Sequence, residues 1–106
     1  MFLLNSHALG RHYFPETFQR GHTGTAYFNV RNNFDEELED VNVKVYIYEL
    51  GLLYSSSSDD IEANDHELKR VNVNIPKKVP VGKYLVRISA GNDHFRDVEH
   101  AYITIA

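Results

Sequence analysis

Regular alternation of apolar and polar residues is the feature that most constrains how this chain folds. In the segment 41–47 the odd positions are all aliphatic: Val41, Val43, Val45 and Ile47. In the segment 84–90 the even positions are apolar or aromatic: Tyr84, Val86, Ile88 and Ala90. Successive side chains of a β-strand point to opposite faces, so a period of two predicts strands with one buried face.

The same pattern recurs along the chain, with Pro, Gly, Asn, Ser and Asp in the intervening turns. Three further strands are expected at 23–31, 68–75 and about 98–105, with the following residues inward: Ala26, Phe28 and Val30; Val71, Val73 and Ile75; Ala101, Ile103 and Ile105. No segment has a convincing helical period. Short strands at near-regular spacing predict an all-β, immunoglobulin-like antiparallel β-sandwich of about seven strands.

The remaining segments are less regular. Residues 2–4 predict a first strand, and residues 7–22 predict an irregular crossing with one edge strand at 13–14, where Phe14 and Phe18 close one end of the core. The acidic run 35–40 and the polar stretch 55–60 predict exposed loops, and 61–68 predicts a turn at most. A turn and a short strand are expected over 49–54.

Size and composition limit the functional classes. A chain of 106 residues is expected to form one domain, with an irregular N-terminal strand region (1–22) and a sandwich body (23–105). Its net charge of -4 disfavours nucleic-acid binding, which requires a basic face. The absence of cysteine excludes disulfides and thiolate zinc sites. No apolar run has transmembrane length, and residues 1–4 are too short for a signal-peptide core.

Three segments together resemble a known family. They are Asn29 to Asn33, the acidic stretch leading into Asp40-Val41-Asn42-Val43, and Ile75-Pro76 through Gly82-Lys83-Tyr84, with Glu49-Leu50-Gly51 between them. In this order and spacing the chain is similar, over about residues 23–105, to the CARDB-like and NEW3-like repeats of prokaryotic surface proteins, including archaeal S-layer proteins. The resemblance implies an exported, non-enzymatic module of the cell envelope, used in architecture or adhesion.

Metal and catalytic chemistry have little support in the sequence. The weak calcium candidate is an acidic stretch that offers several oxygen ligands but lacks the Gly-centred calcium loop: Asp59, Asp60, Glu62 and Asp65. The six histidines lack the spacing of a zinc site and are read as scattered surface residues: His7, His12, His22, His66, His94 and His100. No catalytic constellation is found, so we expect no enzyme activity and no cofactor apart from this calcium option.

One sheet face is the candidate interface. In an immunoglobulin-like sandwich the third, sixth and seventh strands share a sheet, whose outer surface here would carry Tyr46, Tyr48, Leu85, Arg87, His100 and Tyr102. Tyr and Arg are enriched in interface cores, although cross-strand tyrosines can also serve only to stabilise a sheet. Tyr84, at the start of its strand, is expected to form a tyrosine corner by bonding to backbone.

These observations predict a structural, assembly or adhesion module of a cell-surface or secreted prokaryotic protein. Its partners would be proteins, either neighbouring domains or further copies of itself, and an extended N-terminal strand could add to a neighbour's open edge. The alternatives are a carbohydrate-binding or calcium-dependent binding module, with Tyr46 and Tyr48 stacking on sugar rings, and an accessory domain of a larger secreted hydrolase.

Overall fold

Five long strands form the frame of the molecule. The structure is a computed structural model that describes residues 2–3 and 11–106. The long strands are β4 (Thr23–Arg31), β5 (Leu38–Ile47), β8 (His66–Asn74), β9 (Gly82–Gly91) and β10 (Arg96–Ile105). Five shorter strands join them: β1 (Phe2–Leu3), β2 (Arg11–Tyr13), β3 (Thr17–Phe18), β6 (Leu52–Ser55) and β7 (Asp59–Ile61). In the described part of the chain the only helical element is the 3-10 turn η1 (Tyr48–Leu50).

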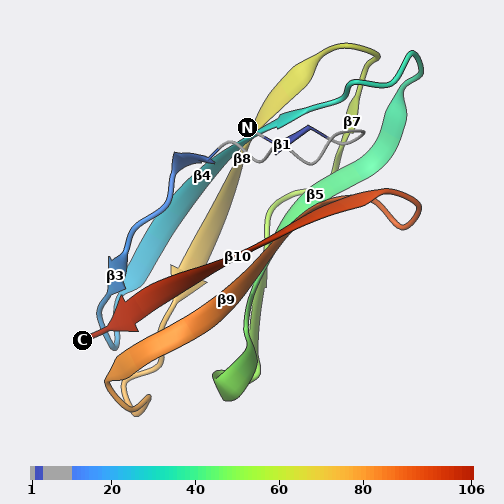
Figure 1. Cartoon of the computed structure of the whole chain (residues 1–106). Coiled ribbons are helices and arrows are strands. Elements are labelled where there is room, and N and C mark those ends of the chain that lie inside the picture. Colours follow the sequence, from blue (N-terminus) through green and yellow to red (C-terminus); the bar gives the residue numbers. More distant parts are fainter. Residues whose placement is uncertain (1, 4–10) are drawn as a thin grey trace.

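The strands form two sheets that pack face to face (Figure 1). In the first sheet, β1 and β2 pair with one edge of β4, and β8 pairs with the other edge. The second sheet has the order β3-β10-β9-β5-β6, and β7 extends the outer edge of β5 beyond β6. All pairs are antiparallel except β1 with β4 and β3 with β10. The predicted all-β immunoglobulin-like sandwich is therefore confirmed.

The core lies between the sheets and follows the predicted alternation. Every inward residue predicted on the five long strands is buried, except Ala101, which packs against the core but is only partly buried. Phe18 is 3% exposed and Phe14 packs beside it, as expected for residues that close one end of the core. The tyrosine corner is also present, because the Tyr84 hydroxyl donates a 2.6 Å hydrogen bond to the Pro80 carbonyl.

Two segments predicted to be loops are strands instead. Leu38 to Asp40 belongs to β5, with a bulge at which Asp40 takes a positive φ of 56°, and Asp59 to Ile61 forms β7. The physical reason is a single apolar residue within each acidic run. Leu38 and Ile61 pair across the two strands and are both buried, which draws the flanking carboxylates into register.

The other differences concern strand ends. β8 begins at His66, two positions before the predicted start at Leu68, and its alternation then turns Lys69 inward. At the N-terminus, the predicted first strand is β1, with Leu4 outside the described residues, and the predicted edge strand at 13–14 is β2, which ends at Tyr13. No helix among the described residues has the length and apolar character needed to cross a membrane.

Candidate functional site

The predicted interface residues do gather on the outer face of the second sheet. Strand pairing places Leu53, Tyr46, Arg87 and His100 in one row across β6, β5, β9 and β10. Leu85 and Tyr102 form the next row, and Tyr48 follows from η1. We call this surface the tyrosine face: Tyr46, Tyr48, Leu53, Leu85, Arg87, His100 and Tyr102. Leu53 was not predicted, because the pattern of its strand is too short to assign a face.

The aromatic rings of the tyrosine face support one another. Tyr46 and Tyr48 meet edge to face with centroids 4.9 Å apart. Tyr48 also stacks on His100, and its hydroxyl lies 3.3 Å from the His100 Nε2 atom. The Lys83 Nζ atom sits 5.4 Å from the centre of the Tyr102 ring. Even so, Tyr102 stays 62% exposed and Leu53 57% exposed, so a broad area of apolar and aromatic surface faces solvent.

The face is also positively charged. The cross-strand rows of this face begin with Ser55–Lys44–Ser89–Val98 and end with Lys83–Thr104. These rows carry three cations, Lys44, Lys83 and Arg87, and no carboxylate. A shallow hollow of about 220 Å³ lies among Lys44, Tyr46, Leu53, Arg87 and Ser89. Arg96 closes the side near the β9–β10 turn by donating to Ser89 Oγ at 3.2 Å and to Asn42 Oδ1 at 3.1 Å. Burial, and then the charge of Arg87, lower the pKa of Arg96.

The acidic segments meet at one end of the sandwich, which we call the loop end. The Asn32 side chain donates to carbonyls of Glu36, Ile61 and Glu62, and so joins the loop before β5 to the segment after β7. The Asn92 side chain donates to the Glu39 carbonyl, which brings the β9–β10 turn to the same end. Residues 35–40 hold five carboxylates and residues 59–67 hold five more.

The four calcium candidates do not form a cation site. Asp59 pairs with Lys69, Asp60 accepts from the Asp40 amide, and Asp65 accepts from the His66 amide. Among residues 2–3 and 11–106, no three Asp, Glu, His or Cys side chains lie close enough to hold a metal ion. His7, the first of the six histidines, lies outside the described residues.

Lys69 is a buried cation on the inward-facing side of β8. It is 1% exposed, and its Nζ atom lies 2.5 Å from Asp59 Oδ2 and 3.3 Å from the Ser57 carbonyl. Its hydrogen bond and then its charge lower the pKa of Asp59. Lys69 therefore connects β8 to the segment between β6 and β7, and so joins the two sheets along one side.

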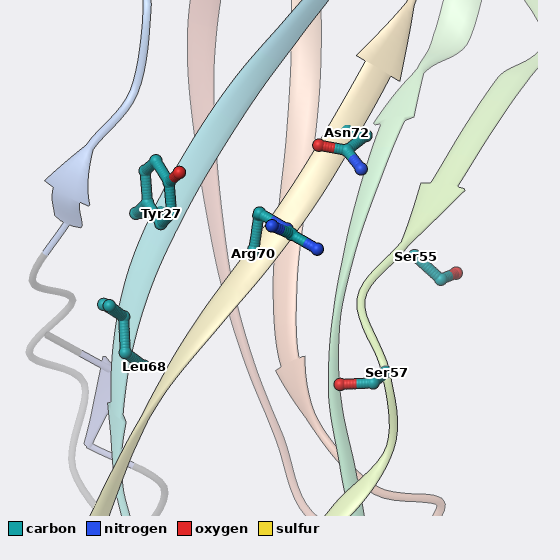
Figure 2. Close-up of a pocket in the computed structure, with 6 residues that line it drawn as sticks. All are labelled: Tyr27, Ser55, Ser57, Leu68, Arg70 and Asn72. Carbon is teal, nitrogen blue, oxygen red and sulfur yellow. The ribbon is translucent and has the colours of Figure 1, made fainter.

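Above this connection lies a groove of about 400 Å³, lined by Tyr27, Ser55, Ser57, Leu68, Arg70 and Asn72 (Figure 2). One wall is the outer surface of β8 and β4, and the other is the segment that follows β6. The Arg70 guanidinium extends from β8 toward the segment that carries Ser55 and Ser57, and Asn72 lies on β8 beside it (Figure 2). The groove was not predicted, because its two walls are more than ten positions apart in sequence.

Comparison with known proteins identifies the fold. No family model and no curated protein matches the chain. Among solved structures, the CARDB domain of a Pyrococcus furiosus protein, determined in complex with di-metal ions, matches with a TM-score of 0.63 at 15% identity, covering 87% of this chain and 81% of that one. The chain has the fold of a CARDB domain. This confirms the fold implied by the sequence resemblance.

The same CARDB-like fold occurs within larger proteins. A Pseudomonas fluorescens alkylpurine DNA glycosylase bound to DNA with an abasic site analogue matches with a TM-score of 0.64 at 15% identity, and a Clostridium perfringens family 123 glycoside hydrolase with 0.59 at 12%. The matches cover 93% and 86% of this chain but only 29% and 23% of those proteins. A likeness at this identity shows the fold alone, and the CARDB-like fold is thus used as one part of proteins with different activities.

Proposed function

We propose that this chain is a non-enzymatic protein-contact module, which packs its tyrosine face against the acidic loop end of a second copy. The observation that carries the proposal is the composition of that face. The exposed Tyr48, Leu53 and Tyr102 are interspersed with Lys44, Lys83 and Arg87, without a carboxylate, on a chain whose net charge is -4. Tyr and Arg dominate interface cores, and complementary charge gives such contacts their specificity.

The proposed contact joins two different surfaces of the molecule. A face that binds another copy's loop end leaves that copy's own face open to the next one. Such heterologous contacts continue into open chains unless the rotation between copies closes a ring. We therefore propose a structural or assembly role, with adhesion as its cellular form, at the cell surface or outside the cell. Support comes from the sequence resemblance and from the use of this fold as a module.

Carbohydrate binding by the tyrosine face has less support. Sugar rings stack on open aromatic faces, whereas Tyr48 already stacks on His100 and Lys83 already lies over Tyr102. A second candidate function, an accessory domain of a larger hydrolase, is favoured by the likeness to part of a glycoside hydrolase. The length of the parent reading frame tests that candidate.

The test of the proposal is molar mass by light scattering, measured against protein concentration at low and at high salt. We expect the mass to rise with concentration without stopping at a dimer, and to fall as salt screens the charges. The face variant Lys44→Glu with Arg87→Glu should stay monomeric. The matched control, Lys77→Glu with Lys78→Glu, makes the same change in net charge on the exposed β8–β9 turn and should associate like the parent.

A charge swap makes the test specific to the two surfaces. Glu36→Lys with Glu37→Lys reverses part of the loop end and should abolish association alone. Mixed with the face variant, it should restore association, because its unaltered basic face meets the unaltered acidic end of the face variant, and the acidic face meets the basic end. A parent protein that is monomeric at every concentration and salt level would refute the proposal. So would a face variant that associates as strongly as the control.

A further inference from the structure

The free edge of β8 presents backbone hydrogen-bonding groups toward the groove of Figure 2. The register between β4 and β8 is continuous from Thr23–Asn74 to Arg31–His66. In such a ladder both backbone groups of a residue point to one side, and successive residues alternate. Two independent contacts fix this alternation. Ile75 bonds to His22 and Gly21 on the β4 side, whereas the Asn74 carbonyl accepts from the Tyr54 hydroxyl at 2.5 Å on the opposite side.

The same alternation places the N–H and C=O groups of Leu68, Arg70 and Asn72 at the free edge. In the described part of the chain β8 pairs with β4 alone. The Tyr54–Asn74 bond closes the free edge at the C-terminal end of β8. Nearer the N-terminal end of β8, the inward-facing Lys69 bonds to Ser57 and Asp59. From Leu68 to Asn72 the edge runs for about 13 Å at the usual rise of a strand, which suits a short extended peptide.

The side chains in the groove add a preference for negative charge. Arg70 is exposed, and none of the six residues that line the groove is a carboxylate. Asp59, two positions after Ser57, is already bonded to Lys69. Asn72 uses its Oδ1 atom to accept from Thr25 Oγ1 at 3.0 Å, which leaves its amide N–H groups to donate. Leu68, 55% exposed, and Tyr27 supply apolar contact beside them. A guanidinium with an amide donor nearby is the arrangement that binds a carboxylate.

We propose that this groove binds an extended peptide that carries a carboxylate side chain. The peptide adds to β8 as an extra strand, bonding to the backbone of Leu68, Arg70 and Asn72, and its carboxylate pairs with Arg70. The groove lies beside the free edge of β8, between the two sheets, whereas the tyrosine face lies on the outer surface of the second sheet and shares none of the residues that line the groove. The peptide site is therefore independent of the proposed assembly, and either proposal can fail without the other.

The experiment is a titration of the isotopically labelled chain with the peptide acetyl-Thr-Val-Glu-Val-Thr-amide, followed by amide proton and nitrogen shifts. We expect the largest shifts at the β8 amides of Leu68, Arg70 and Asn72. Two N-methylated peptides test strand addition without altering the protein. One carries methyl groups on the Glu and both Thr, and the other on the two Val. Because alternate N–H groups face β8, one of these peptides should bind and the other should not.

Matched arginine variants test the carboxylate pairing. Arg70→Gln should weaken binding roughly tenfold, while Arg20→Gln, which removes an exposed arginine from the turn between β3 and β4, should leave it unchanged. Replacing Glu by Gln in the peptide should have the same effect as Arg70→Gln. The proposal is overturned if both N-methylated peptides bind alike. It is also overturned if β8 shows no shifts, or if the peptide instead perturbs the amides around Arg87.

Discussion

At the end of the sandwich that holds the C-terminus, which we call the terminal end, apolar rings fill the space between the sheets. At the loop end, polar side chains bridge the connecting segments. The terminal end is closed by Phe14 and Phe18, whose ring centroids lie 6.1 Å apart, and by the tyrosine corner at Tyr84. The loop end is bridged by Asn32 and Asn92, which bond mainly to backbone, and by the rings of Phe34 and Phe95, whose centroids lie 4.8 Å apart. Ring contacts therefore occur at both ends, and the loop end adds side-chain amide hydrogen bonds to backbone groups.

This difference follows from what each end has to hold. At the terminal end, strand β3 pairs with β10 and lies against the first sheet, so apolar contact suffices. At the loop end, three turns leave the ladders with unpaired backbone groups that are shielded from water, and such groups need specific partners. We expect substitutions at the loop end to act through lost hydrogen bonds, and those at the terminal end to act through packing.

The largest effect is expected from Asn32→Ala. Asn32 is 0% exposed, donates to three carbonyls and accepts from the Phe34 amide at 2.8 Å. Removing its side chain leaves these backbone groups buried without partners, so the free energy of unfolding should fall by about 3 kcal/mol. Urea denaturation measures the change. Asn74→Ala, an exposed asparagine on β8, should cost less than about 0.5 kcal/mol, and equal losses for both would refute the special role of Asn32.

Asn32 also illustrates what the sequence predicts and what it does not. Its position after an alternating segment correctly indicated the end of a strand, because a polar residue interrupts the apolar period. Its role as a link to Ile61 and Glu62 depends on segments about thirty positions away, and no local pattern contains that information. The same limit applies to β7, since Ile61 has its partner in Leu38.

The candidate sites divide in the same way. Alternation within each strand predicted which side chains share the tyrosine face, and strand pairing then placed Arg87 between Tyr46 and His100. Lys69 was missed because a lysine is normally exposed, and its bonds to Asp59 and to the Ser57 carbonyl make its burial tolerable. The groove beside Arg70 was missed because it forms between strands of different sheets.

At the terminal end, the sharper test is Gly24→Ala. A Cβ atom at position 24 would lie 2.5 Å from the Phe18 ring, which is itself 3% exposed. The ring must shift, so overpacking should lower the free energy of unfolding by about 2 kcal/mol. The smaller side chain of Phe18→Leu, combined with Gly24→Ala, should recover part of that loss. A double variant that is less stable than either single variant would show that the end is not limited by packing.

At the loop end, the smallest expected effect is a dependence on pH through Asp59. Lys69 holds the pKa of Asp59 below its ordinary value of 3.8, so the folded state binds the proton less readily than the unfolded state. The contribution of this carboxylate is therefore complete above about pH 4 and is lost as the pH falls through the lower, folded pKa. Its size should be modest, because the Asp59 side chain is 48% exposed.

Urea denaturation at a series of acidic pH values measures this contribution. Asp59→Asn should lower stability at neutral pH, because Lys69 is then a buried charge with no counter-ion, and it should flatten the decline in acid. Lys69→Met in the same background should recover the neutral loss, since it removes the uncompensated charge and keeps an unbranched side chain. Asp35→Asn, which removes a loop carboxylate without touching Lys69, serves as the control.

If Asp59→Asn and Asp35→Asn followed the same pH curve, the bond from Lys69 to Asp59 would not contribute to the stability of the loop end. This end would then depend on its asparagines and on the Phe34–Phe95 ring contact, and what distinguishes it from the terminal end would be its amide hydrogen bonds, without a part for charge.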